Sequence, residues 1–125
     1  MTRRILIADD YADTAESLAL LLRSSGDDVQ TAIDGLQAIA LAEKFRPEFV
    51  LLDIRMPNLN GYEAAKRIRQ QPWGRDMVLI AFTAGSRREA ERLCREAGFD
   101  AHLIKPASPT DISRLLANIS PNGQH

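Results

Sequence analysis

The stretch Phe49-Val50-Leu51-Leu52-Asp53 consists of four apolar residues that stop at a carboxylate. A short, continuously apolar run of this kind is typical of a strand buried on both faces of a parallel sheet. Three other runs have the same form, and they are Ile5–Ala8 before Asp9-Asp10, Met77–Phe82 before Thr83, and Leu103-Ile104 before Lys105. Because parallel strands share one direction, we expect these polar ends to meet at one edge of the sheet, where open α/β sheets bind ligands.

Helix-like segments alternate with the strand-like runs five times along the chain. Capping-box spacing marks four helix starts, at Asp13 with Glu16, Asp34 with Gln37, Asn60 with Glu63, and Ser86 with Glu89. Ser108-Pro109 opens the last helix with a capping residue and a proline. This order predicts a three-layer α/β/α, flavodoxin-like, doubly wound fold with five helices and a five-stranded parallel sheet of order 2-1-3-4-5.

Two of the strand-like runs have features of sheet edges. In the second run, Val29, Thr31 and Ile33 alternate with Asp28, Gln30 and Ala32. Such alternation predicts a strand that is solvated on one face, and we therefore place this run at an edge. The fifth run is short, as edge strands often are.

Composition excludes several classes of protein. The chain has 125 residues, which is one domain by length, and we expect that domain to cover 1–120 with a disordered polar tail at 121–125. The net charge of -1 argues against direct nucleic acid binding. No apolar run approaches the roughly 20 residues that span a bilayer. The single Cys94 excludes an internal disulfide, and the N-terminus does not resemble a signal peptide, so we expect a cytoplasmic protein.

The predicted strand order brings three carboxylates together, those of Asp9, Asp10 and Asp53. Two unit charges about 4 Å apart repel by roughly 4 kcal/mol at an effective dielectric constant near 20. A divalent cation removes this conflict, and hard carboxylate oxygens suit Mg²⁺. The alternative is that Asp9-Asp10 only caps the first helix.

Lys105 and Thr83 add a point charge and a hydroxyl to the same edge. Phosphoryl transfer needs mainly positioning and charge neutralisation, which such groups supply. Asp53 is the best acceptor candidate, because it ends a central strand between the acidic pair and Thr83. The alternatives are that Lys105 is a solvated surface lysine and that Thr83 is an ordinary threonine at the end of a strand.

The chain resembles the receiver domain of two-component response regulators, in its stand-alone single-domain form or, alternatively, as a domain excised from a longer kinase. The resemblance lies in four motifs, namely Ile7–Asp10, Leu52–Gly61, Phe82–Ala84 and Leu103–Pro106. It implies that Asp53 accepts a phosphoryl group from a phosphohistidine. It also implies that Mg²⁺ is held by Asp10, Asp53 and the backbone carbonyl of Arg55, with Asp9 acting through water. Lys105 and Thr83 would hold the phosphoryl oxygens, and the Lys105-Pro106 bond would be cis.

The resemblance also identifies positions that would tune or transmit the signal. Thr83 and His102 take the places of the family's switch pair, although most members have Tyr or Phe at the second position. Arg55 and Gly85 take positions that tune phosphoryl lifetime, and we hypothesise that Arg55 lies over the acceptor. The implied partners are a histidine kinase or a histidine phosphotransfer protein, together with an unknown output partner. The implied assembly is a monomer or a weak homodimer.

Two other functions compete with a signalling module. The first is a Mg²⁺-dependent phosphohydrolase with an aspartyl nucleophile. Hydrolases of the haloacid dehalogenase type have a second acid two residues after the nucleophile, where this chain has Arg55, and usually a cap. The second is a flavodoxin-like nucleotide binder, but no glycine-rich phosphate loop follows the first strand. We therefore expect no enzyme activity beyond the chain's own phosphorylation and dephosphorylation.

Overall fold

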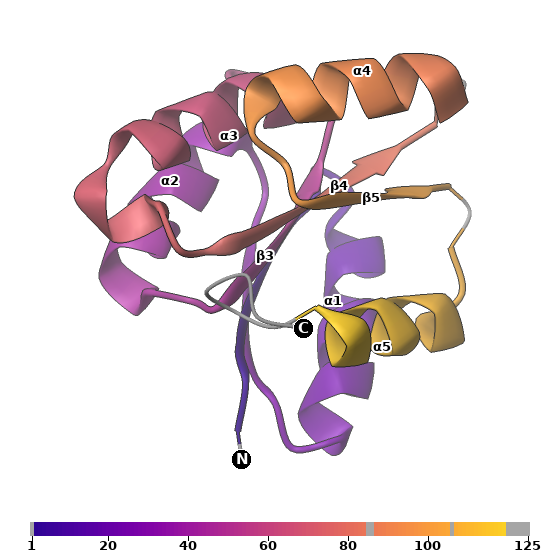
Figure 1. Ribbon diagram of the computed structural model, residues 1–125. Coiled ribbons are helices and arrows are strands. Elements are labelled where there is room, and N and C mark those ends of the chain that lie inside the picture. Colours follow the sequence, from indigo (N-terminus) through magenta and orange to yellow (C-terminus); the bar gives the residue numbers. More distant parts are fainter. Residues whose placement is uncertain (1, 85–86, 106, 120–125) are drawn as a thin grey trace.

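The computed structural model describes residues 2–84, 87–105 and 107–119 (Figure 1). The elements, in chain order, are β1 (Arg4–Ala8), α1 (Ala12–Ser24), β2 (Asp28–Ala32), α2 (Gly35–Phe45), β3 (Phe49–Asp53), α3 (Gly61–Gln70), the 3₁₀ turn η1 (Pro72–Gly74), β4 (Val78–Thr83), α4 (Arg87–Ala97), β5 (Ala101–Ile104) and α5 (Pro109–Asn118). Within these ranges, no helix combines the length and the apolar character that crossing a membrane requires. The predicted tail at 121–125 lies outside the described residues.

The five strands form one parallel sheet in the order β2-β1-β3-β4-β5, which confirms the predicted order. The two strands predicted at the edges, β2 and β5, lie there. The register pairs Ala8 with Leu52 and Asp53 with Phe82. The carboxyl ends of β1, β3 and β4 therefore lie side by side, and the residues that follow them share one edge of the sheet.

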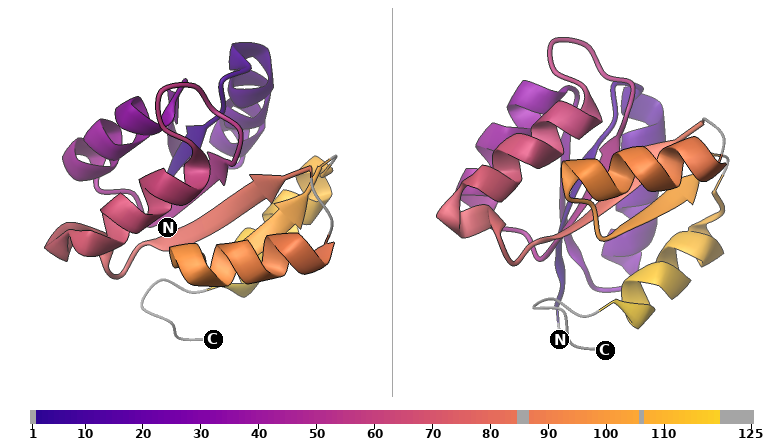
Figure 2. Two further views of the ribbon diagram at one scale, coloured as in Figure 1. Left: turned by 90° about the horizontal axis from the view of Figure 1, so that it is seen from above. Right: turned by 45° about the horizontal axis from the view of Figure 1, so that its top comes forward.

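Two hydrophobic cores lie on opposite faces of the sheet. One contains the buried residues of α1 and α5, and the other contains those of α2, α3 and the end of α4. The ribbon views show the same division, with α1 and α5 together and the other three helices across the sheet (Figures 1 and 2). The central strand β3 is buried along its whole length, because helices cover both of its faces.

The predicted helix caps are confirmed at three of the starts. The side chains of Asp34, Asn60 and Ser108 accept backbone N–H groups of α2, α3 and α5. Ser86 lies outside the described residues. The prediction for Asp13 is wrong, because this residue lies inside the first turn of α1. Asp9 accepts the N–H of Tyr11 at 2.9 Å, and the helix begins directly afterwards.

The alternation predicted for the second strand holds only in part. Val29 is buried as expected, but Ile33 is 53% exposed and Ala32 is fully buried. The strand ends at Ala32, whose carbonyl accepts the Asp9 N–H. The N–H of Ile33 donates to the Gln37 side chain in α2 at 2.7 Å. Ile33 therefore lies after the strand and just before the cap of α2, so the predicted alternation does not extend to it.

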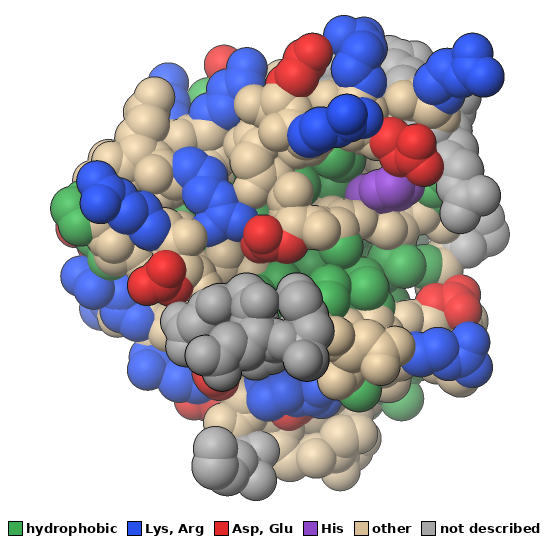
Figure 3. All heavy atoms as spheres, viewed as in Figure 1, with side chains coloured by type: hydrophobic (Ala, Val, Ile, Leu, Met, Phe, Trp, Pro, Cys, Tyr) green, Lys and Arg blue, Asp and Glu red, His purple; other side chains and the backbone are tan. Residues whose placement is uncertain are grey.

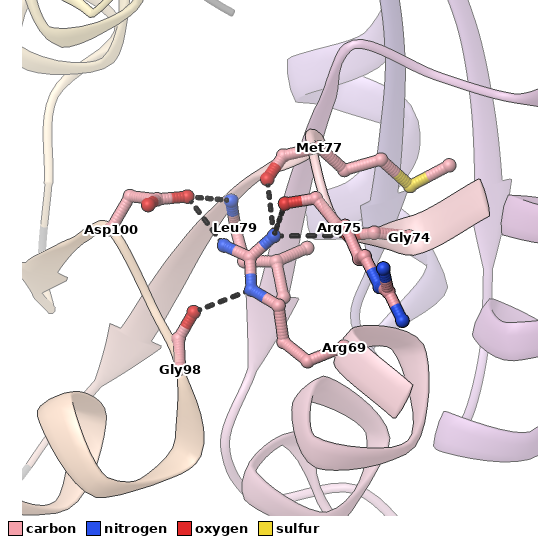
Figure 4. Close-up of polar contacts among 7 residues, drawn as sticks. All are labelled: Arg69, Gly74, Arg75, Met77, Leu79, Gly98 and Asp100. Carbon is pink, nitrogen blue, oxygen red and sulfur yellow. Dashed lines mark hydrogen bonds and ion pairs between the residues drawn. The ribbon is translucent and has the colours of Figure 1, made fainter. Parts of the chain in front are cut away.

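Arg69 joins three segments at the end of the sheet opposite to the strand ends discussed below (Figure 4). Its guanidinium donates to the carbonyls of Gly74, Arg75, Met77 and Gly98 and to the carboxylate of Asp100. The same Asp100 oxygen accepts the Leu79 N–H at 2.9 Å. One side chain of α3 thus fixes the start of β4 and the connection between α4 and β5.

Candidate functional site

The candidate site lies at the carboxyl ends of four strands, as the apolar runs predict. Asp9 and Asp10 follow β1, Asp53 ends β3, Thr83 ends β4, and Lys105 follows β5. The strands that carry them are neighbours in the sheet. The structure therefore brings together five polar residues that are up to 96 positions apart in the chain (105 - 9).

The three carboxylates form a compact cluster. One oxygen from each of Asp9, Asp10 and Asp53 lies within 4.8 Å of the others. Asp9 and Asp53 are buried, whereas Asp10 is exposed. Mg²⁺ prefers hard oxygen ligands and usually takes only one or two carboxylates, keeping waters or phosphate oxygens for its other positions. The donor set fits this ion, and the acidic triad is typical of a Mg²⁺ site.

Lys105 lies against the buried side of this cluster. Its ammonium nitrogen is 3.1 Å from Asp53 Oδ1 and 3.8 Å from Asp9 Oδ2. Burial raises the pKa of Asp53 above its ordinary value of 3.8, Lys105 opposes this effect, and the negative charge of Asp9 adds to it. The net result is a raised pKa, so the lysine only partly compensates the buried charge. The cluster therefore favours a further cation.

A cleft of about 380 Å³ opens beside the cluster. Its lining residues are Asp10, Asp53, Ile54, Arg55, Tyr62, Phe82, Thr83, Ala84, Ala90 and Lys105. A cavity of this volume has room for a phosphoryl group and for the waters of a metal ion. Asp9 instead lines a larger groove of about 770 Å³, whose walls come mainly from α1 and α5. Of the three carboxylates, Asp10 and Asp53 thus face the cleft.

Thr83 and Arg55 both line the cleft. Thr83 is buried, and its carbonyl accepts the Lys105 N–H at 2.8 Å, which links the ends of β4 and β5. Arg55 is exposed, and its backbone N–H donates to Asp53 Oδ1 over 3.4 Å, a long hydrogen bond. Arg55 therefore lies beside the predicted acceptor, on the wall of the cleft.

His102 lies apart from the cleft. It is half-buried in β5, where it pairs with Ala81, and it lines a separate pocket of about 280 Å³ together with Cys94 and Phe99. The space-filling view shows a histidine side chain, in purple, at the surface between acidic and basic groups (Figure 3). Cys94 is buried, as expected for a packed residue. Gly85 and Pro106 lie outside the described residues.

Tyr62 is a cleft residue that the sequence motifs did not identify. It lies in the first turn of α3 and lines the cleft, and its ring contacts Phe99 edge-on with centroids 6.3 Å apart. Phe99 in turn lines the pocket beside His102. The sequence shows an aromatic residue directly after Asn60-Gly61, but it does not show which way the Tyr62 side chain points. That direction depends on how α3 packs against α4.

Comparisons with known proteins agree on the kind of domain. A family model described as "Response regulator receiver domain" matches residues 5–117. An uncharacterised 14.6 kDa protein of Leptolyngbya boryana is 34% identical over 112 residues, which cover 90% of this chain and 86% of that protein. The transcriptional regulatory protein PdtaR of Mycobacterium tuberculosis is 39% identical over 88% of this chain. The chain spans about half of the length of PdtaR, 53%.

Two solved structures are similar over nearly the whole chain. The chemotaxis response regulator CheY4 of Vibrio cholerae has a TM-score of 0.88 and 26% identity, with 94% of this chain and 98% of that chain covered. The receiver domain of the sensor histidine kinase PA1611 from Pseudomonas aeruginosa has a TM-score of 0.84 and 34% identity, with 93% and 95% covered. The PA1611 domain was solved with a magnesium ion coordinated in its active site cleft.

Proposed function

The chain belongs to the family of response regulator receiver domains, and on that premise we propose that Asp53 accepts a phosphoryl group from a phosphohistidine. The observation that carries this proposal is the meeting of three carboxylates within 4.8 Å, with Lys105 3.1 Å from Asp53 Oδ1. This set has a nucleophile, a cation that orients it, and oxygen donors for a metal. Those are the groups that phosphoryl transfer needs.

Asp10, Asp53 and the backbone carbonyl of Arg55 are the proposed Mg²⁺ ligands, and Asp9 is proposed to act through a water molecule. The exposure of Asp10 and its place in the cleft lining support its assignment as a direct ligand. Asp9 faces Lys105 and the groove beside α1, which supports an indirect role. When bound, Mg²⁺ would neutralise the carboxylates and the phosphoryl oxygens.

The proposed reaction forms one bond and breaks one. A carboxylate oxygen of Asp53 attacks phosphorus, the P–N bond of the phosphohistidine breaks, and its electron pair remains on the imidazole, which takes a proton from water. Lys105 then pairs with a phosphoryl oxygen, and the Thr83 hydroxyl donates to another. Tyr62 and Phe82 line the cleft as well.

The proposed phosphodonor is a histidine kinase or a histidine phosphotransfer protein, and the output partner is unknown. Thr83 and His102 are the proposed switch pair, because they lie on the neighbouring strands β4 and β5. Arg55 and Gly85 are proposed to tune the lifetime of the phosphoryl group. We place the protein in the cytoplasm as a monomer or weak homodimer without direct nucleic acid contacts.

Incubation with Mg²⁺ and acetyl phosphate tests the proposal, with intact-mass measurement as the readout. We expect one added phosphoryl group on the wild-type chain and none on Asp53→Asn. Asp76→Asn is the matched control, because this exposed carboxylate precedes β4 at the opposite end of that strand. An adduct that persists in Asp53→Asn would contradict the assignment. Steady release of phosphate from simple phosphate esters would favour the phosphohydrolase instead.

A further inference from the structure

The β3–α3 loop, residues 54–60, carries the backbone carbonyl of Arg55 past the acceptor. The loop is closed at its base, where the Gly61 N–H donates to the Ile54 carbonyl at 3.0 Å. A Cβ atom at Gly61 would lie 2.4 Å from the Asp53 carbonyl oxygen, so α3 begins in direct contact with the end of β3. Any movement of the loop therefore changes the surroundings of Asp53 as well as the position of Arg55.

The outer turn of the loop is fastened to α2 by one side-chain pair. Asn58 Nδ2 donates to Asp34 Oδ2 at 2.8 Å, and the other oxygen of Asp34 accepts the Gln37 N–H at 2.7 Å. Asp34 thus caps α2 and binds the loop at the same time, with a different oxygen for each task. Asn58 has a φ of 67°, a left-handed conformation that asparagine tolerates better than most residues.

Backbone packing beside this pair is equally tight. A Cβ atom at Gly35 would lie 2.1 Å from the Leu59 carbonyl oxygen, so the start of α2 and the loop are in van der Waals contact. Leu59 itself is buried in the core on that face of the sheet. The first turn of α2 is therefore a fixed support, against which the loop rests and to which Asn58 ties it.

We propose that Asp34 and Asn58 form a latch that positions the β3–α3 loop, and with it the Arg55 carbonyl, for Mg²⁺ binding beside Asp53. Asp34 and Asn58 are positioning residues, since neither belongs to the acidic cluster itself. The inference rests on the proposed function, because it assigns the loop a role in holding the metal. Residues behind metal ligands commonly matter in this way, since they fix the ligands that touch the ion.

A simpler account is that Asp34 only caps the helix and that buried Met56 and Leu59 hold the loop. The two accounts differ in their effect on metal affinity. If Asp34 is only a cap, loss of the Asn58 amide leaves the Mg²⁺ dissociation constant of the folded protein unchanged. If the pair is a latch, loss of the amide lets the Arg55 carbonyl move, and Mg²⁺ binds more weakly whether or not stability changes.

Asn58→Gly is the first test, because glycine readily adopts the left-handed conformation and removes the side-chain amide. We expect its Mg²⁺ dissociation constant, measured by calorimetry, to rise about tenfold. Arg46→Gly is the matched control, since Arg46 also has a positive φ, 54°, but lies at the end of α2 outside the cleft lining. The control should bind Mg²⁺ as the wild type does. An unchanged dissociation constant in Asn58→Gly would overturn the latch.

The double variant Asp34→Asn with Asn58→Asp is the second test. It exchanges donor and acceptor, so that the amide at position 34 donates to the carboxylate at position 58, while asparagine still caps the helix. Net charge is unchanged, and aspartate tolerates left-handed φ. We expect wild-type Mg²⁺ affinity, and affinity as weak as that of Asn58→Gly would count against the latch.

The two proposals fail in different ways. If wild-type protein neither binds Mg²⁺ nor forms an adduct with acetyl phosphate, the proposed function is wrong and the latch falls with it. If wild-type protein does both and Asn58→Gly matches it in Mg²⁺ affinity, only the latch is wrong. Unfolding midpoints of the metal-free variants separate a loss of stability from a loss of metal affinity.

Discussion

The Lys105 ammonium lies 3.1 Å from Asp53 Oδ1, at the point where β3 and β5 end on the same edge of the sheet. It is a single positive charge beside three carboxylates. Asp53 is buried, and its pKa is raised in spite of this neighbour, with burial as the largest cause. Metal-free protein therefore pays a penalty in stability for holding an ionised Asp53, and this penalty has a defined dependence on pH.

Asp53→Asn should raise the stability of the metal-free domain at pH 7. The native pKa is raised above 3.8, so between these two values the folded protein binds more protons than the unfolded chain. The penalty is absent below the unfolded pKa, grows as pH rises through this window and is complete above it. Urea unfolding in the presence of a chelator measures the difference between variant and wild type. A stabilisation that is equal at pH 7 and below pH 4 would contradict this explanation.

Mg²⁺ should stabilise the wild-type chain more than variants of its proposed ligands. At a concentration one hundred times the dissociation constant, binding to the folded state alone adds about 2.7 kcal/mol to the free energy of unfolding. We expect Asp10→Asn to lose most of this gain at the same Mg²⁺ concentration, because Asp10 faces the cleft. Thermal unfolding with and without Mg²⁺ is the measurement, and Asp76→Asn is the control. If Mg²⁺ stabilises Asp10→Asn as much as the wild type, Asp10 is not a ligand of the metal.

Arg69→Ala should destabilise the domain by about 2–4 kcal/mol, because it leaves several carbonyls and a carboxylate without their shared donor. The side chain of Arg69 is 21% exposed, and its contacts join α3, η1 and the α4–β5 connection. Arg69→Lys should recover only part of the loss, since an ammonium cannot reproduce the planar fork of a guanidinium. Urea denaturation measures both variants against Arg67→Ala, an exposed neighbour. If Arg69→Lys is as stable as the wild type, the planar geometry of the guanidinium does not matter for stability.

The sheet order and the strand ends could be predicted because each depends on a local pattern. An apolar run that stops at Asp53 indicates a buried strand and its end, and parallel strands then share an edge. The same logic placed Lys105 and Thr83 near the acidic cluster. Helix caps were predictable where one side chain reaches its own helix, as Asn60 does.

The interactions that escaped prediction join residues with no local relationship. Asp34 and Asn58 are 24 positions apart, and Arg69 and Asp100 are 31 apart. Each pair joins the end of a helix to a distant loop, and no rule of local spacing predicts such a contact. The prediction for Asp13 was wrong for a related reason. The Asp9 carboxylate accepts the N–H of Tyr11, and α1 begins directly afterwards, one residue before Asp13.

Arg55→Ala should shorten the lifetime of the phosphorylated state. Arg55 is exposed and lines the cleft two residues after the acceptor, and we expect its side chain to shield Asp53 from water. Removing it should speed hydrolysis of the aspartyl phosphate by roughly 3- to 10-fold, a change of about 1 kcal/mol in the barrier. Its positive charge also attracts anionic donors, so phosphorylation by acetyl phosphate should slow.

The decay of the intact-mass adduct after removal of the donor measures the first effect, and the rate at which the adduct forms measures the second. Lys66→Ala is the matched control, because it removes one exposed positive charge from α3 without altering the cleft lining. If Arg55→Ala and Lys66→Ala change both rates equally, the effect is one of net charge alone. If Arg55→Ala changes neither rate, the Arg55 side chain does not govern access to Asp53, and other residues of the cleft lining must set it.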